Sequence, residues 1–188
     1  MVESGKTVDK EATLKNIEEF WDSWYVTGLS DFIRVPNLTP MVDPEFLTNG
    51  LIEKAVECVD EYVKKIDIQG ITRKYYQPQG CSPLLVYVIE PTGGATKNVL
   101  LYGHLDKQPW MDGWDEGLGP TNPVIRGEFL YGRGGADDGY APFTSLLAVK
   151  NLQQQGVPCP RIALVLETEE ESASPNLLQL LEEAKDFI

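Results

Sequence analysis

Two short runs of continuous apolar residues constrain the fold of this chain more than any other feature. Val99–Tyr102 and Ile162–Leu166 contain no polar or charged side chain apart from one tyrosine hydroxyl. Such runs are typical of strands that are buried on both faces, whereas a strand with one solvent-exposed face alternates polar and apolar residues. Segments with helical periodicity lie before, between and after the two runs, and strands that alternate with helices favour α/β layers. We therefore expect Val99–Tyr102 and Ile162–Leu166 to be neighbouring inner strands of an α/β sheet.

The rest of the chain divides into further helices and strands by its apolar spacing. The predicted helices are Val8–Ile33, Pro44–Ile66, Ala141–Gln155 and Pro175–Lys185. The predicted strands are Ile71–Gln77 and Leu84–Glu90, followed by a hairpin over Val124–Tyr131 that turns at Gly127-Glu128. Asp43 and Ser174 stand where N-caps of the second and last helices belong.

The charge of the chain excludes several classes of partner. Its 188 residues carry a formal net charge of −13 at pH 7. A chain this acidic is poorly suited to nucleic acid or to an anionic membrane surface, because both need a basic face. No apolar run reaches the roughly 18–20 residues that a membrane span needs. We expect neither nucleic acid nor membrane as a partner.

The cysteines and the first residues bear on the compartment. Cys58, Cys81 and Cys159 form no CxxC pair, and any pairing leaves one of them over. This pattern is typical of reduced thiols. Residues 1–6 are polar and lack the apolar core of a secretory signal. Together these features predict a cytoplasmic location.

Polar clusters follow both apolar runs and identify the candidate site. Gly103–Asp106 follows the first run, and Glu167–Glu171 follows the second. A third cluster, Gly132–Gly139, joins the hairpin to a helix. Since sites in α/β sheets gather outside the carboxyl ends of strands, chemistry is expected where these clusters meet.

Each cluster has an ordinary structural interpretation as well as a chemical one. His104 is the only histidine, and a single histidine is often a structural residue with its hydrogen bonds satisfied. Asp106 lies two residues further on, so in an extended segment it would point to the same side as His104. Its carboxylate could then fix the tautomer of the imidazole and leave the other ring nitrogen free for a metal. Asp137-Asp138 could simply cap the next helix. Glu169–Glu171 could be a solvated acidic face.

A cation is the chemical alternative for these acids. Adjacent carboxylates at the end of a buried strand repel each other, and a cation would relieve that repulsion. A calcium loop of the EF-hand type is excluded, because the acids are spread too widely and no D-x-[DN]-x-[DN]-G is present. One imidazole with several carboxylates suits zinc, with manganese or cobalt as alternatives.

The ordered set of motifs resembles the M20 family of metallopeptidases. The matching segments are Leu101–Asp106, Asp112–Trp114, Leu130–Gly134 with Asp137-Asp138, and Glu170–Ser172. The resemblance implies layered helices around a mixed, largely parallel sheet of the zinc-exopeptidase type. Asp112-Gly113-Trp114 is most similar to the glutamate carboxypeptidase and cytosolic dipeptidase branch.

The resemblance also implies a role for each candidate residue. His104 would bind one of two divalent metal ions, Asp137 would bridge both, and Glu171 would bind the other. Glu170 would be the general base and acid that acts on a metal-bridging water, and Asp106 would be the carboxylate behind His104. A cis peptide bond between Asp137 and Asp138 is expected as well.

Two departures from the family pattern affect the expected extent of the enzyme. The lysine that often follows the Asp pair is replaced by Gly139, a change that we expect to be tolerated because that lysine is not a ligand. The chain also lacks a second histidine, and the family's further acidic ligand and inserted lid domain would follow Ile188. We therefore expect residues 1–188 to be the N-terminal portion of the catalytic domain, without the lid, dimerisation and C-terminal segments. The parent enzyme would be a homodimer, and the 188 residues alone would be inactive.

Three hypotheses for function follow. The first is a metal-dependent exopeptidase, of carboxypeptidase or dipeptidase type, that acts on a small peptide or dipeptide. The second keeps the same residues but takes an N-acyl amino acid as the substrate of an amidase or deacylase. The third is a catalytically inactive fragment that binds a partner.

Overall fold

The computed structural model describes residues 6–188. Most of the polar N-terminal segment, residues 1–5, lies outside this range. The helices are α1 (Lys10–Phe20), α2 (Thr27–Arg34), α3 (Leu51–Ile66), α4 (Tyr140–Gln155) and α5 (Leu177–Ala184), with short helical segments η1 (Trp21–Val26), η2 (Gly135–Gly139) and η3 (Glu170–Ser172). The strands are β1 (Ile71–Tyr76), β2 (Leu84–Ile89), β3 (Asn98–His104), β4 (Val124–Arg126), β5 (Phe129–Tyr131) and β6 (Arg161–Glu167).

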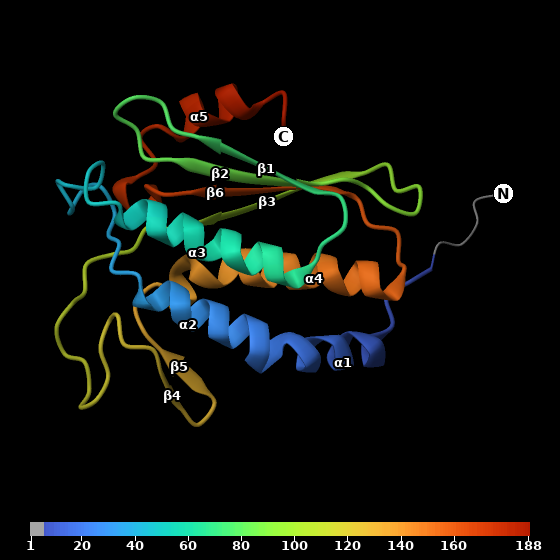
Figure 1. Ribbon diagram of the computed structural model, residues 1–188, viewed down its shortest axis with the longest axis horizontal. Helices are drawn as coiled ribbons and strands as arrows, with labels where there is room; N and C mark the ends of the chain where they lie inside the picture. Colours follow the sequence, from blue (N-terminus) through green and yellow to red (C-terminus); the bar gives the residue numbers. More distant parts are fainter. Residues whose placement is uncertain (1–5) are drawn as a thin grey trace.

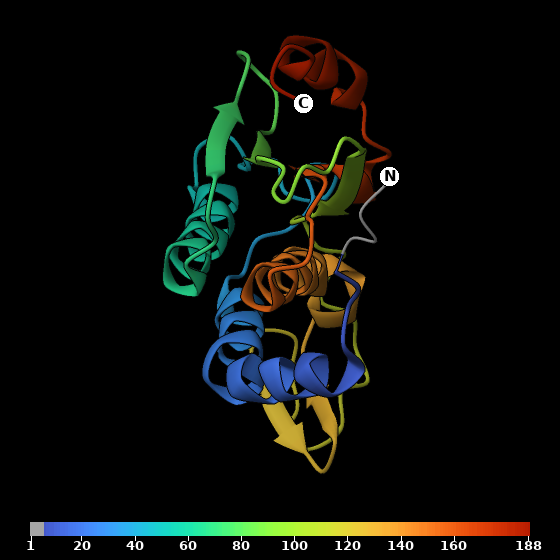
Figure 2. The ribbon, with the colours of Figure 1, turned by 90° about the vertical axis from the view of Figure 1, so that its right-hand side faces the viewer.

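Helices cover a central sheet on both faces, as the α/β prediction requires. Helix α5 lies on one face, and α3 and α4 lie on the other with α1 and α2 beyond them (Figure 1). The β4–β5 hairpin lies at the end of the molecule opposite α5, which both views show (Figures 1 and 2). Side chains of β2 alternate between the two layers. Leu84, Val86 and Val88 pack on the α5 side, whereas Leu85 and Tyr87 join the core on the α3–α4 side.

The sheet has the strand order β1-β2-β6-β3 and mixed direction. β3 and β6 pair in parallel, with Val99 opposite Ile162, so the two apolar runs are neighbours as predicted. The pairings of β1 with β2 and of β2 with β6 are antiparallel. The expectation of a largely parallel sheet is therefore wrong for the four-stranded sheet that residues 6–188 form. The reason is that β2 follows β1 through a short turn, and such a turn joins antiparallel strands.

The prediction that both apolar runs are inner strands is half wrong. β6 is an inner strand, but β3 is an edge of the sheet formed by residues 6–188. Its side chains are accordingly exposed, by 37% at Val99, 61% at Leu100 and 48% at Tyr102. An unbroken apolar run reports a tendency to be buried, but burial also needs a neighbouring element, and no described strand lies beyond β3.

The long N-terminal helix is predicted correctly in extent but not in its interior. α1, η1 and α2 run on without a break from Lys10 to Arg34, against a predicted helix over Val8–Ile33. The middle segment η1 is π-helical. It carries Trp24, which packs edge-on against Tyr62 of α3 and Phe143 of α4. This aromatic cluster joins three helices in the core beneath the sheet.

Two helix starts differ from the prediction. Pro44–Asn49 forms turns, and α3 begins only at Leu51 after Gly50, whose φ is 70°. Asp43 caps these turns instead, accepting from the Glu45 N–H at 3.0 Å. α5 begins at Leu177, and its N-cap is Asn176 rather than Ser174. Polar residues before a helical pattern mark a turn without specifying which residue begins the helix.

The remaining elements agree with the sequence. α4 covers the predicted Ala141–Gln155, and β4 and β5 form the predicted hairpin around Gly127-Glu128. Across residues 6–188, no helix combines the length and apolar character that crossing a membrane demands.

Candidate metal centre

The first part of the site is the carboxyl end of β3. His104 is the last residue of the strand and is only 5% exposed. The fully buried Asp106 places Oδ1 3.3 Å from His104 Nδ1, and its main-chain oxygen lies 3.2 Å from the same nitrogen. The predicted pairing of the two side chains is therefore present. It leaves His104 Nε2 directed at the rest of the site.

The second part is the glycine-rich segment that precedes α4. Asp137 and Asp138 interrupt η2 with non-helical backbone angles, and the peptide bond between them is cis, as the resemblance implied. Asp138 Oδ2 accepts the main-chain N–H of His104 at 3.2 Å. Asp138 thus binds the end of β3 rather than capping α4. Asp137 is left free to face the imidazole.

The third part follows β6. Glu170 and Glu171 open the short helix η3, and their main-chain N–H groups donate to Asp106 Oδ1 and Oδ2 at 3.1 and 3.0 Å. One buried carboxylate therefore ties the end of β6 to the end of β3. The acidic run is not a solvated surface, because Glu169 is buried and Glu171 is half-buried.

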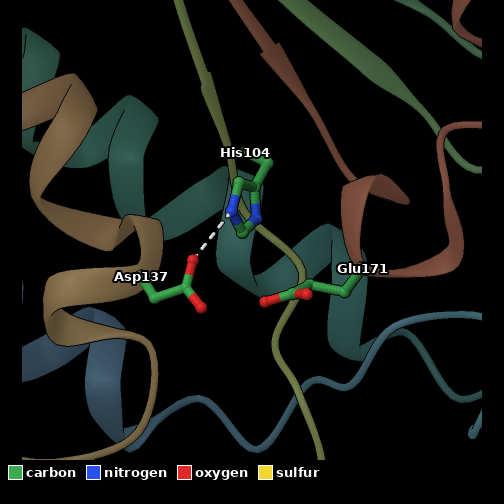
Figure 3. A group of neighbouring side chains, drawn as sticks. All are labelled: His104, Asp137 and Glu171. Atoms are coloured by element: carbon green, nitrogen blue, oxygen red, sulfur yellow. Dashed lines mark hydrogen bonds and ion pairs between the residues drawn. The ribbon is translucent and has the colours of Figure 1, made fainter.

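The three parts bring His104, Asp137 and Glu171 together. One ligand atom from each lies within 4.8 Å of the others. His104 Nε2 is 3.2 Å from Asp137 Oδ1, and Figure 3 shows the Glu171 carboxylate across from this pair. The predicted convergence is confirmed. Glu170 stands beside the group, with Oε2 3.8 Å from His104 Nε2, and its side chain is 43% exposed.

The electrostatics of the group are those of crowded acids around one imidazole. Burial disfavours the protonated form of His104, but the hydrogen bond and charge of Asp106 outweigh it and raise the pKa of His104 to about 9. Burial, followed by the nearby charge of Asp137, raises the pKa of Glu171. A cation among these groups would replace the proton that the crowding favours.

The residues fit a divalent cation. An imidazole nitrogen and two carboxylates are a common ligand set for zinc and related metals. Glu171 Oε1 is buried and has no hydrogen-bond partner among the described residues. A buried carboxylate oxygen without a donor is costly, so a cation would stabilise it.

Three more side chains lie close to these residues in the chain, and the sequence assigned none of them a role. Gln108 donates from Nε2 to Glu171 Oε2 at 2.5 Å. Lys107 is fully buried and donates to the main-chain oxygens of Phe32 and Val35 at 2.8 and 2.6 Å, and burial lowers its pKa to about 7. Glu167 is fully buried and accepts from Tyr102 at 2.5 Å. Gln108 and Lys107 directly follow the cluster Gly103–Asp106, which was the available signal.

Comparison with known families identifies the second half of the chain. Residues 100–188, which contain every candidate site residue, match the model of Peptidase family M20/M25/M40. This part of the chain belongs to peptidase family M20. The M20 segment begins within β3 and ends after α5.

A curated relative extends the similarity beyond the M20 segment. An uncharacterised metallohydrolase of Methanocaldococcus jannaschii is 32% identical over 160 residues, which cover 81% of this chain and 38% of the relative. The chain thus spans well under half the length of that relative.

Solved structures share the fold. A dipeptidase of Saccharomyces cerevisiae, Dug1p, has a TM-score of 0.74 at 21% identity, covering 93% of this chain and 37% of its own. Human carnosine dipeptidase 1 has a TM-score of 0.73 at 23% identity, with 94% and 38% covered. An M20 metallo-carboxypeptidase of Sulfolobus solfataricus has a TM-score of 0.69 at 23% identity, with 86% and 34% covered. The fold shared with these structures therefore extends over both halves of the chain.

Gly103 provides a test of how closely β3 must approach the Asp137-Asp138 segment. A Cβ at Gly103 would lie 2.6 Å from Ala141 Cβ and 2.8 Å from Asp138 Oδ2. We expect Gly103→Ala to lower the free energy of unfolding by about 1–3 kcal/mol, because the added methyl overpacks this contact. Denaturant unfolding measures the change. Gly119→Ala is the matched control, since its Cβ would meet only Asn122 Cβ at 3.9 Å; equal effects of the two substitutions would contradict the prediction.

Proposed function

We propose that residues 1–188 form the N-terminal portion of the catalytic domain of a metal-dependent exopeptidase, of dipeptidase or carboxypeptidase type. The observation that carries the proposal is the convergence of His104, Asp137 and Glu171 from three segments far apart in the sequence. The M20 match over residues 100–188 supports peptide hydrolysis as the reaction. The remaining ligands, the lid and the dimerisation segment would come from sequence beyond Ile188.

The metal part of the proposal assigns two divalent ions, zinc with manganese or cobalt as alternatives. His104 would hold one ion, Glu171 the other, and Asp137 would lie between them. When bound, such ions would lower the pKa of water towards neutrality and polarise the scissile carbonyl. The His104–Asp106 contact would keep Nε2 unprotonated towards the metal.

The catalytic part assigns the proton transfers to Glu170. Its carboxylate stands beside the three proposed ligands, with Oε2 3.8 Å from His104 Nε2, and it is partly open to solvent. From this place it would take a proton from the attacking water and return it to the leaving amine. Its main chain is held by Asp106, so the base would be positioned on the same carboxylate that orients His104.

The substrate would be a small peptide or dipeptide, and the complete enzyme would be a homodimer. A cytoplasmic location belongs to the same proposal, since Cys58, Cys81 and Cys159 are all free thiols.

The 188 residues alone should bind zinc weakly and hydrolyse no dipeptide. They supply three proposed ligands, whereas catalytic zinc sites normally use three protein ligands for each metal. Isothermal titration with zinc and a dipeptide hydrolysis assay measure both properties. His104→Ala, Asp137→Ala and Glu171→Ala should each abolish the weak binding, while Glu128→Ala in the exposed hairpin turn should leave it unchanged. Zinc affinity that is unchanged by all three substitutions would refute the metal centre. Dipeptide hydrolysis by the purified 188-residue chain would refute the proposal that these residues lack part of the active site.

A further inference from the structure

We propose that Gln108 is a positioning residue for Glu171, and that its amide holds the carboxylate so that the other oxygen is free to bind the cation. The inference rests on the proposed function, because it concerns the same metal centre. No assignment of Gln108 comes from the sequence motifs, which stop at Asp106 on this strand end.

The contact is specific to one oxygen of the carboxylate. Gln108 Nε2 donates to Glu171 Oε2 at 2.5 Å, whereas Oε1 is buried and has no partner among the described residues. The two oxygens are therefore unequal. The amide satisfies one of them, and the second keeps its lone pairs in the group that also contains His104 and Asp137.

The backbone that leads into Gln108 is anchored at Leu105 and Lys107. The preceding Lys107 is tied through Nζ to the end of α2, and its main-chain oxygen accepts the Thr39 N–H at 2.9 Å. Asn37 Nδ2 donates to the Leu105 oxygen at 2.7 Å. Because the preceding backbone is fixed, the Gln108 side chain starts from a defined position beside Glu171.

The neutral charge of the amide matters for this role. Glu171 shares the site with the carboxylate of Asp137, and a cation bound between them would be held by the charge of both. A lysine or arginine in place of Gln108 would neutralise Glu171 and compete with the cation. A glutamine donates one hydrogen bond and leaves the negative charge available.

The test is Gln108→Leu in the 188-residue chain, with Zn²⁺ and Co²⁺ as probes. We expect zinc affinity to fall by about 10–100-fold, as is typical when the partner of a ligand is removed. We also expect the visible absorption spectrum of bound Co²⁺ to change, because the geometry of one ligand changes. Gln179→Leu is the matched control: Gln179 is exposed on α5 and donates to Glu183 at 3.4 Å, so its loss should change neither readout.

A double-mutant comparison separates positioning from a general effect on the fold. In a Glu171→Asp background, which keeps a carboxylate but withdraws it from the Gln108 amide, Gln108→Leu should cause no further loss of affinity, since the two residues act through one interaction. Additive losses would overturn the inference. Should Gln108→Leu fail to fold, judged by thermal unfolding without metal, Gln108→Asn serves instead, because its amide is one methylene too short to reach Oε2.

The outcomes distinguish this inference from the proposed function. Wild-type chain that binds metal, with Gln108→Leu or Gln108→Asn binding equally well, overturns the role of Gln108 alone. Wild-type chain that binds neither Zn²⁺ nor Co²⁺ overturns the metal centre and the role of Gln108 together.

Discussion

Replacing Glu170 with alanine in the complete peptidase should lower turnover of a dipeptide by about 10²–10⁴-fold, the usual contribution of a general acid–base group. Zinc content should stay unchanged, because Glu170 is not among the three residues whose ligand atoms converge. Its carboxylate lies beside this group, 3.8 Å from His104 Nε2, and is partly open to solvent. The measurements are steady-state kinetics and elemental analysis of the same preparation.

The neighbouring residue is the natural control for this prediction. Glu171→Ala removes a carboxylate one position along the same short helix, but it should lower zinc content as well as turnover. A Glu170→Ala protein that loses its zinc would show that Glu170 is a ligand. A Glu170→Ala protein that retains full turnover would show that another group moves the proton.

Asp106→Ala should have the second largest effect, on both metal binding and stability. The substitution leaves the main-chain N–H groups of Glu170 and Glu171 without their acceptor. Each buried donor without a partner costs about 1–3 kcal/mol of the free energy of unfolding. Loss of the contact to His104 should also weaken zinc binding by about 10–100-fold.

Asp106→Asn separates the shape of this side chain from its charge. Its amide oxygen can replace one acceptor, but its NH₂ group would face the second N–H donor, so we expect a stability between those of wild type and Asp106→Ala. Denaturant unfolding without metal and zinc titration of the folded protein measure the two effects separately. An Asp106→Ala protein with wild-type stability and zinc affinity would show that the contacts of Asp106 with His104, Glu170 and Glu171 are unimportant.

Much of the site was predictable because its residues are adjacent to strong local signals. His104 and Glu171 each follow an unbroken apolar run, and parallel strands bring their carboxyl ends to one edge of a sheet. Asp137 was harder, since its glycine-rich segment is equally consistent with a helix cap. Only the contact between Asp138 and the His104 N–H shows which alternative the fold adopts.

The sequence by itself determined the alternation of helices and strands, the pairing of the two apolar runs and the three clusters that carry the chemistry, because apolar periodicity and strand ends are local properties. The tertiary structure alone decided the edge position of β3, the antiparallel majority of the sheet and the contact of Gln108 with Glu171. These depend on which elements lie beside each other in space. Leu100 shows the difference: its apolar neighbours predict burial, but its side chain is exposed because no described strand covers that edge.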